Sequence, residues 1–482
     1  MEKINGRKLS LIFIFILILL VIALLVGKFT YSYLGPTVSE DLETQGEVTA
    51  SGDTLIFTKG NNLSLSATTD NFTTGGTNLT STTNPKVKLV ASTKTNQANA
   101  TYYVGVLIKN NTYVYTTSGK TPELILTIKD EKGNNVTAGV DGLTYVTSGG
   151  VSGFDVTGKK GLFNIKTDYP ISTTSSSAGT THTWTFTLTF VNLGTDQSDN
   201  ENASMNVDIY LQKDEYKLPT LVEYVKSQYT GTQGGNGIYY HNSSLANGAG
   251  DNSYRYAGAS ESVNNYICLG SDAASCPDAN LFRIIGVFGD KTKVIRAKSV
   301  SGQKWHTSES ITWSSSSLNT YLNGTYLTSL GTLADKIAIT TWKVGGGTSS
   351  DIYSSVPKTA YQYEVGSRAS STTVDKKIGL MYVSDYYYSA SPSAWTLVGN
   401  DDDATKDYRA AKTTNWLSLG SDEWTISLLS EVPGYAFNVT STGYVSYHNM
   451  TYSYAVRPSF NLESSVKYVS GSGSMSDPVR VK

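Results

Sequence analysis

We first consider histidine, serine and lysine as residue types that could carry catalysis or bind a metal ion. The sequence holds four histidines: His182, His241, His306 and His448. No two of them have the spacing of zinc ligands, and no cysteine accompanies them. Ser301-Gly-Gln-Lys304 matches the S-x-x-K of serine acyl-enzymes, but the companion motifs of those enzymes do not follow downstream. We therefore assign no catalytic, cofactor-binding or metal-binding residue.

Carboxylates offer a second kind of chemistry. The stretch Asn400–Asp407, NDDDATKD, gathers several carboxylates, and calcium takes about 6–8 oxygen ligands. No glycine follows at the expected turn and no distal glutamate closes a known calcium loop, so we expect a solvated acidic loop, with calcium as the alternative. Asp385, Asp422 and Glu423 would be the acid and base of a glycan-cleaving enzyme if two of them lay about 5–10 Å apart.

A charged residue interrupts the apolar run Tyr454–Leu462 near the C-terminus. Because a charge inside a domain is tolerated only when it is paired and hydrogen-bonded, we expect Arg457 to contact a carboxylate or several backbone carbonyls from residues 378–425. Pro458 cannot donate to a sheet and must lie at an edge, a bulge or a strand start. Both residues are interpreted as structural. The whole run is predicted to be a strand in the middle of its domain, with three buried side chains: Val456, Phe460 and Leu462.

The chain has two cysteines, Cys268 and Cys276, in the stretch CLGSDAASC. Outside the cytoplasm, two nearby cysteines most simply form a disulfide, and closing so short a loop would stabilise the fold by roughly 2–3 kcal/mol. The bridge would fasten one hairpin rather than hold a domain together. Two free thiols are the alternative.

An extracytoplasmic location is indicated by the apolar run Leu9–Val26, which follows a basic N-terminus. A run of about 18 apolar residues is near the lower limit for a helix that spans a bilayer, and the positive-inside bias places the N-terminus in the cytoplasm. We therefore expect a single-pass cell-membrane protein, with residues 1–27 as cytoplasmic tip and transmembrane anchor, residues 28–50 as a tether, and the remainder outside. Secretion after cleavage of a signal peptide is the alternative.

Residues 51–215 alternate with a period of two. In Thr183–Phe190 the large apolar side chains share one face and threonines occupy the other. Short alternating strands with Gly, Asn and Asp turns predict a β-sandwich domain. The boundary FTYSYLG and the ending TWTFTLTFVNLGTDQ, behind a membrane-proximal hydrophobic segment, resemble the camelysin and TasA group of Gram-positive surface β-sandwich proteins. Camelysin is described as a metalloprotease, but no HExxH is present here, so that activity is not carried over.

The pattern of apolar residues changes in residues 216–237. Pro219 and the apolar residues Leu221, Val222 and Val225 predict one short amphipathic helix, and a glycine-rich stretch then forms a linker. Residues 238–482 are predicted to be a second, mixed α+β domain. Within it Gly289-Asp290 indicates a hairpin turn, and Trp313 begins a helical face and is interpreted as structural.

The second domain contains, in order, ITWSSSSLNTYLN, IGLMYVSDYYYSA, NWL, STGYVSYHN and YAVRPSFNL. This order resembles a domain of unknown function that is common in surface proteins of Gram-positive gut bacteria. That domain is distantly similar to the C-type-lectin-like fold of the formylglycine-generating enzyme. The resemblance implies an α+β fold at the cell surface and no known activity. Formylglycine-generating enzymes work through cysteines late in the domain, and none follows Cys276. The Glu-Pro-Asn and Trp-Asn-Asp motifs of calcium-dependent lectins are also missing.

Composition narrows the function further. The net charge of −2 gives no basic surface for nucleic acid, and 33 Tyr and 7 Trp suit binding through rigid aromatic contacts. We interpret the chain as mainly β, membrane-anchored and non-enzymatic, with a C-type-lectin-like head that binds a glycan or a protein. An extracytoplasmic enzyme acting on cell-wall or other glycans is one alternative. A pilin-like or matrix subunit that assembles through sheet edges is the other.

Overall fold

The computed structural model describes residues 45–50, 52–67, 71–72, 75–271, 273, 275–308 and 312–482, and the fold is mainly β. Among these residues, no helix is both long and apolar enough to cross a membrane. The predicted anchor Leu9–Val26 and most of the predicted tether lie outside the described residues. The end of that tether is a strand rather than a linker: β1 (Gln45–Ala50) is the sheet neighbour of β2 (Asp53–Thr58).

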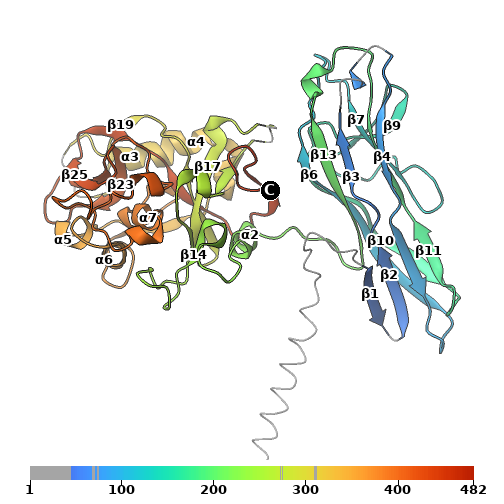
Figure 1. Ribbon diagram of the computed structural model, residues 1–482, viewed down its shortest axis with the longest axis horizontal. Coiled ribbons are helices and arrows are strands. Elements are labelled where there is room, and N and C mark those ends of the chain that lie inside the picture. The colour runs from blue at the N-terminus through green and yellow to red at the C-terminus, as the bar shows by residue number, and fades with distance from the viewer. Residues whose placement is uncertain are drawn as a thin grey trace, which may run out of the picture. The chain divides into compact units, whose positions relative to one another are not determined.

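The described strands of residues 45–212 form three sheets (Figure 1). Their strand orders are β1-β2-β5-β11, β10-β6-β13-β3 and β4-β12-β7-β9-β8. The remaining bounds are β3 (Leu63–Ser66), β4 (Leu79–Thr83), β5 (Lys86–Val90), β6 (Ala98–Asn111), β7 (Leu124–Lys129), β8 (Thr144–Ser148), β9 (Val151–Asp155), β10 (Gly161–Thr173), β11 (Thr180–Thr183), β12 (Thr185–Phe190) and β13 (Ser204–Gln212). Strand β6 pairs antiparallel with β10 and β13, and β12 pairs antiparallel with β4 and β7.

The alternating apolar residues of Thr183–Phe190 form part of the core of these sheets. Trp184, Phe186, Leu188 and Phe190 are all buried, as the alternation predicts. Trp184 itself lies between β11 and β12. Its backbone N–H donates to the carbonyl of Pro85 at 3.0 Å. Buried side chains from β6, β7, β12 and β13 join one hydrophobic cluster, so two of the sheets share a core.

The described strands of residues 238–481 form a nine-stranded sheet, a five-stranded sheet and a two-stranded sheet. The nine-stranded sheet has the path β22-β27-β18-β17-β16-β29-β28, and β15 joins it by pairing with β17 and with β14. The five-stranded sheet has the order β19-β26-β23-β24-β25. The third sheet is the pair β20 and β21. The bounds are β14 (Ile238–Tyr240), β15 (Tyr254–Tyr256), β16 (Tyr266–Cys268), β17 (Leu281–Phe288), β18 (Lys291–Arg296), β19 (Gly302–Lys304), β20 (Thr340–Lys343), β21 (Thr373–Lys376), β22 (Ile378–Gly379), β23 (Glu423–Leu428), β24 (Tyr435–Val439), β25 (Val445–Asn449), β26 (Ser453–Ala455), β27 (Ser459–Leu462), β28 (Tyr468–Ser470) and β29 (Val479–Val481).

Short helices connect these strands. The α-helices are α2 (Leu221–Ser227), α3 (Ser317–Tyr321), α4 (Leu327–Ser329), α5 (Ser349–Ile352), α6 (Pro357–Glu364) and α7 (Val383–Tyr388), and a π-helical turn, η6 (Leu322–Tyr326), joins α3 to α4. The 3-10 turns are η2 (Ser198–Asn200), η3 (Gly235–Gly237), η4 (Ser260–Ser262), η5 (Asp278–Asn280), η7 (Gly331–Lys336), η8 (Pro392–Ala394) and η9 (Lys412–Thr414). The helix predicted after Pro219 is α2, which begins at Thr220 with a capping box and buries Leu221 and Val225.

The predicted hairpin around Gly289 is present, because β17 and β18 pair on either side of it. Two predicted strands differ from the structure. The apolar sequence of Ile378–Val383 predicts one strand, but only Ile378 and Gly379 are a strand, and Val383 already begins α7.

The predicted single strand Tyr454–Leu462 is also wrong. It is two strands in different sheets, β26 and β27, because Pro458 and its two predecessors leave the ladder between them. The three side chains expected to be buried are buried: Val456, Phe460 and Leu462.

Two large hydrophobic clusters account for most of the buried apolar side chains described. One contains buried residues from Leu55 to Ile209, and the other contains buried residues from Leu221 to Val479. Chain contacts nevertheless group Gly46–Lys482 as one compact unit. The boundary that the sequence places at residues 216–237 therefore stays a prediction.

Candidate functional site

The disulfide expected between Cys268 and Cys276 is present, with the two Cα atoms 5.8 Å apart. Cys268 is the last residue of β16, and Cys276 lies just before η5. The bridge therefore closes the loop that leads from β16 into β17. It fastens this local connection and contributes no reactive thiol, because no cysteine is free.

Arg457 is buried and pairs with a carboxylate from the segment that the sequence indicated. Its Nε and Nη2 atoms donate to the two carboxylate oxygens of Glu423, each at 2.7 Å. Nη2 also donates to the carbonyl of Leu417 at 2.6 Å. The bidentate contact ties the segment between β26 and β27 to the start of β23. Arg457 thus acts as a structural residue.

Trp313 and Pro458 also lie in packed surroundings. The Trp313 side chain is fully buried, and its ring centroid lies 5.0 Å from that of Trp305. Pro458 lies just before β27, and its carbonyl accepts the N–H of Arg296 at 3.0 Å. Both residues are therefore interpreted as structural.

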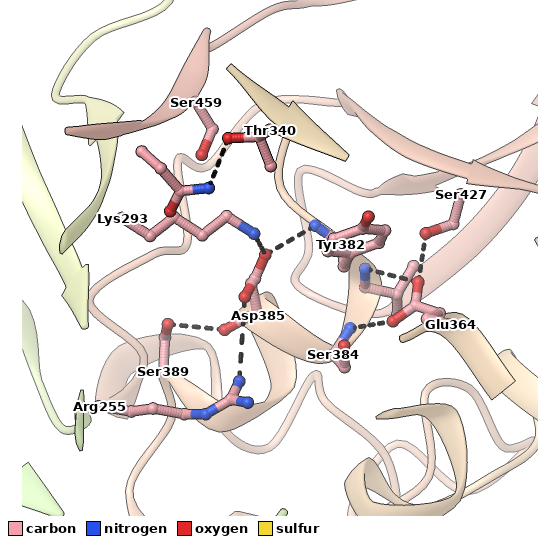
Figure 2. A network of polar contacts seen from close by, with 12 residues as sticks. Arg255, Lys293, Thr340, Glu364, Tyr382, Ser384, Asp385, Ser389, Ser427 and Ser459 are labelled. Atoms are coloured by element: carbon pink, nitrogen blue, oxygen red, sulfur yellow. Dashed lines mark hydrogen bonds and ion pairs between the residues drawn. The ribbon is translucent and has the colours of Figure 1, made fainter. Parts of the chain in front are cut away.

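Asp385, one of the three carboxylates considered for acid–base chemistry, lies in a buried ion cluster (Figure 2). It accepts hydrogen bonds from Lys293 Nζ at 2.5 Å and from the N–H of Tyr382 at 2.9 Å. The Arg255 guanidinium lies 3.9 Å from its other oxygen. These contacts join β15, β18 and α7. They also place the carboxylate between two buried cations, so its oxygens are occupied by structural contacts.

Glu364 occupies the neighbouring part of the same region (Figure 2). Its carboxylate accepts the N–H groups of Val383 and Ser384 at 2.9 and 2.7 Å, as well as the Ser427 hydroxyl. Burial raises the pKa of Glu364, and its hydrogen bonds with Ser384 and Ser427 oppose that rise. The residue therefore satisfies the first N–H groups of α7, which is a structural role.

The other two carboxylates considered are likewise engaged. Glu423 is buried against Arg457, and Asp422 accepts the N–H of Ser441 at 3.0 Å. Each of the three thus has its own partners on a separate element. No contact in the described part of the chain brings two of them together as an acid–base pair.

Two carboxylates of the acidic stretch 400–407 have close partners within the stretch or just after it. Asp407 is fully buried and accepts two hydrogen bonds from Arg409 Nε, at 3.0 and 2.8 Å, and one from the N–H of Asp401. Asp403 accepts from Thr405 and pairs with Lys406 at 3.3 Å. Among the described residues, no group of three or more His, Cys, Asp or Glu side chains is arranged to hold a metal ion.

Each of the four histidines has its own local partner. His182 contacts the Tyr102 hydroxyl at 2.9 Å, and the Nδ1 atoms of His306 and His241 accept the N–H groups of Ser317 and Ala249. His448 contacts Asn438 at 3.0 Å. Of these histidines, only His448 belongs to the aromatic surface described next.

Four aromatic side chains form the surface with the strongest binding character, which we call the β25–β26 aromatic surface: Trp424, His448, Tyr452 and Tyr454. The Tyr454 ring lies 4.7 Å from Trp424 and 5.4 Å from His448, measured between centroids. Tyr452 lies 6.1 Å from Tyr454 with the two rings 24° from parallel. Trp424 is fully buried whereas Tyr452 is 55% exposed, so the rings extend from the core to solvent.

The sheet fixes these rings in place. Trp424 comes from β23 and donates its indole N–H to the carbonyl of Gln303 at 3.0 Å. The register of β24 and β25 pairs Ala436 with His448, so His448 and Asn438 lie on the same face of the sheet. Tyr452 follows a turn in which Asn449 accepts hydrogen bonds from Thr451.

Polar groups accompany the rings. The Nδ2 atom of Asn438 is buried without a hydrogen-bond partner, while its Oδ1 atom contacts His448 Nδ1. Burial raises the pKa of Tyr454, and the nearby charge of Asp422 adds to that rise. Tyr454 therefore keeps its hydroxyl proton at neutral pH and can donate a hydrogen bond.

Sequence reasoning did not single out this surface. The signal that could have found it is the spacing of Tyr452 and Tyr454, which lie two residues apart and just after His448. Aromatic residues at that spacing share one face of an extended segment. Comparison with models of known protein families finds no match, and a search of curated proteins finds none that is similar.

Proposed function

We propose that this chain is a non-enzymatic, membrane-anchored surface protein whose C-terminal head binds a glycan through the β25–β26 aromatic surface. The apolar run Leu9–Val26 supports the anchor. Antiparallel sheets that share one core support a β-sandwich over residues 51–215. Mixed sheets with short helices support an α+β, C-type-lectin-like head over residues 238–482.

The observation that carries the proposal is the exposed Tyr452 ring in continuity with Tyr454 and His448. A sugar presents an apolar face of C–H groups and a rim of hydroxyls. Aromatic rings match the apolar face at a small entropic cost, and phenol or imidazole groups can bind the rim. A surface that begins on a buried tryptophan is also rigid, which limits the ordering cost of binding.

The enzymatic alternative has less support. A glycosidase needs two carboxyl groups on either side of one bond. Asp385 and Glu423 are instead buried, and each is paired with a cation. The described residues thus offer an aromatic surface and no facing pair of unpaired carboxylates.

The proposal is tested by screening the purified full chain on a glycan array and measuring the affinity of the best ligand. We expect Tyr452→Ala to weaken that affinity about tenfold or more, because exposed aromatic anchors dominate such interfaces. Tyr240→Ala is a matched control. Tyr240 is also a partly exposed tyrosine, stacked on Tyr254 with centroids 4.5 Å apart, but it lies on β14 in another sheet.

Two outcomes would contradict the proposal. The full chain could bind no glycan although circular dichroism shows it to be folded. Alternatively, Tyr452→Ala and Tyr240→Ala could reduce glycan affinity equally, which would place the ligand elsewhere.

A further inference from the structure

His241 closes one end of a loop that covers a small aromatic cluster. It follows β14, and residues 242–250 lead from it back toward β15; we call this segment the 242–250 loop. Leu245 and Ala249 of the loop pack on Tyr388 and Trp395. This cluster is separate from the large core of the same region.

The His241 side chain is fully buried, and its hydrogen bonding defines its protonation state. Nδ1 accepts the N–H of Ala249 at 3.1 Å, so it carries no proton, and the ring proton of the neutral imidazole lies on Nε2. Among the described residues, Nε2 has no hydrogen-bond partner. Its surroundings are aromatic, because the Tyr388 ring is perpendicular at 4.8 Å and the Trp395 ring lies at 5.1 Å.

The charges that face this ring would not stabilise an imidazolium. Arg255 on β15 is a nearby cation, and its guanidinium lies 5.0 Å from the Tyr388 ring and 5.3 Å from the Tyr361 ring. Asp251, a carboxylate whose charge acts on His241, is occupied by Arg255 at 2.6 Å and by the Ser253 hydroxyl at 2.5 Å. Asp385 is occupied by Lys293. Burial lowers the pKa of His241 well below its ordinary value, and Arg255 lowers it further, while Asp251 opposes them.

Both ends of the loop are fixed independently of the His241 side chain. The backbone of His241 is hydrogen-bonded to Ser253 and Asn252, and Asp251 is held by Ser253 and Arg255. Between these ends, few contacts join the loop to the other described residues of the head. They are the Ala249–His241 hydrogen bond, the Tyr388 hydroxyl donating to the carbonyl of Asn247 at 3.2 Å, and the packing of Leu245 and Ala249.

From this geometry we propose that the 242–250 loop is an acid-operated latch, which opens when His241 is protonated and uncovers Tyr388 and Trp395. Protonation converts Nδ1 from an acceptor into a donor that faces the N–H of Ala249. It also adds a second positive charge beside Arg255. Moving the loop away admits water to the ring and relieves both conflicts, while the fixed ends keep the opening local.

The direction of the pH dependence follows from proton binding. The closed loop disfavours the proton, whereas an open, solvated His241 titrates near its ordinary pKa of about 6.5. The closed form is therefore fully favoured above about pH 6.5 and is lost as the pH falls below it. Each pH unit below that value raises the ratio of open to closed loops about tenfold, until the closed form itself binds a proton.

Hydrogen exchange followed by mass spectrometry on the purified full chain tests the latch. After correction for intrinsic exchange rates, we expect peptides covering 242–250 to lose protection between pH 7 and pH 5, while peptides of β17 and β18 do not. His241→Asn places a non-titrating acceptor where Nδ1 lies, so its loop should stay protected at both pH values. His306→Gln is the matched control and should respond to pH like the unmodified chain.

Two kinds of measurement could overturn the latch. The first is hydrogen exchange, if the loop opens in acid equally in His241→Asn and in the unmodified chain, or if the loop of the unmodified chain does not open at pH 5. The other does not depend on the variant and covers the case in which His241→Asn fails to fold. Exchange of the imidazole C2 hydrogen reports the pKa of His241 in the unmodified chain. A value near 6.5 while the loop amides remain protected would show that the closed site accepts the proton.

Discussion

At the scale of single residues, buried arginine side chains connect distant segments of the head through hydrogen bonds. Arg283 donates through all of its N–H groups to Asn265, Ser260, Val263 and Trp416. Its guanidinium also lies 4.3 Å from the Tyr266 ring and 4.6 Å from the Trp416 ring. Burial lowers the pKa of Arg283 to about 10, which leaves it charged at neutral pH. The cation is thus held by dipoles and rings, whereas Arg457 is held by a carboxylate.

Arg457→Met should strongly destabilise the head. The substitution keeps much of the apolar volume but leaves Glu423 buried without its cation, and breaking a buried pair in this way costs about 3–5 kcal/mol. Urea unfolding followed by tryptophan fluorescence measures the loss. Lys298→Met is the control, because Lys298 pairs with Asp278 on the surface, with the two side chains 59% and 63% exposed. Its effect should be about 1 kcal/mol or less. Equal effects of the two substitutions would contradict this view of Arg457.

That Arg457 needs a partner could be anticipated from the sequence, but its identity as Glu423 and the role of Asp385 could not. A charge inside an apolar run needs a counter-charge wherever the fold places it. A carboxylate in a mixed sequence carries no such signal. The cation that neutralises Asp385 is Lys293, 92 residues away, and the contact exists only because α7 packs near β18. Sequence reasoning therefore left an acid–base role open for residues that are structural.

At the scale of elements, α7 shows that some of the many tyrosines of this chain have a structural role. Tyr386, Tyr387 and Tyr388 are consecutive and all buried, which no helical periodicity predicts. Each hydroxyl donates to a backbone carbonyl of a segment distant in the sequence: Gly443, Ile352 at the end of α5, and Asn247. Interpreting the many tyrosines as binding residues was therefore too broad, because these tyrosines fasten loops from within the core. The hairpin of β17 and β18 could be predicted since its turn signal is local, whereas α7 depends on long-range packing.

Tyr387→Phe should destabilise the head by about 0.5–1.5 kcal/mol, because it leaves the Ile352 carbonyl without its hydroxyl donor and changes little else. The measurement is again the free energy of unfolding in urea. Tyr452→Phe is the control, since the Tyr452 ring is 55% exposed and its hydroxyl can bond to water. Unfolding free energies for Tyr387→Phe and the unmodified chain that agree within error would show that the hydroxyl is not part of the core.

At the scale of the whole molecule, the two large cores have no residue in common. The buried residues of one end at Ile209, and those of the other begin at Leu221. Strands β27 and β29 contribute Phe460, Leu462 and Val479 to the second core, whereas Val469 of β28 packs with Leu107 and Leu218 in a small separate cluster. β27 lies between β22 and β18, and β29 pairs in parallel with β16. The end of the chain is therefore an internal part of the head sheet and not an appendage to it.

Truncation before Tyr454 should therefore unfold the head and leave residues 51–215 folded. The deletion removes Arg457 together with the fully buried Val456 and Phe460, and it removes three strands of the nine-stranded sheet, β27, β28 and β29. Neighbouring strands would then expose unpaired N–H and C=O groups as well as apolar side chains. Scanning calorimetry of the full chain should show a transition that the truncated chain lacks. The transition that remains should match that of an isolated 51–215 fragment, because none of the deleted residues belongs to its core. A truncated head that still melts cooperatively near the parent temperature would contradict both the two-core description and the structural role given to Arg457.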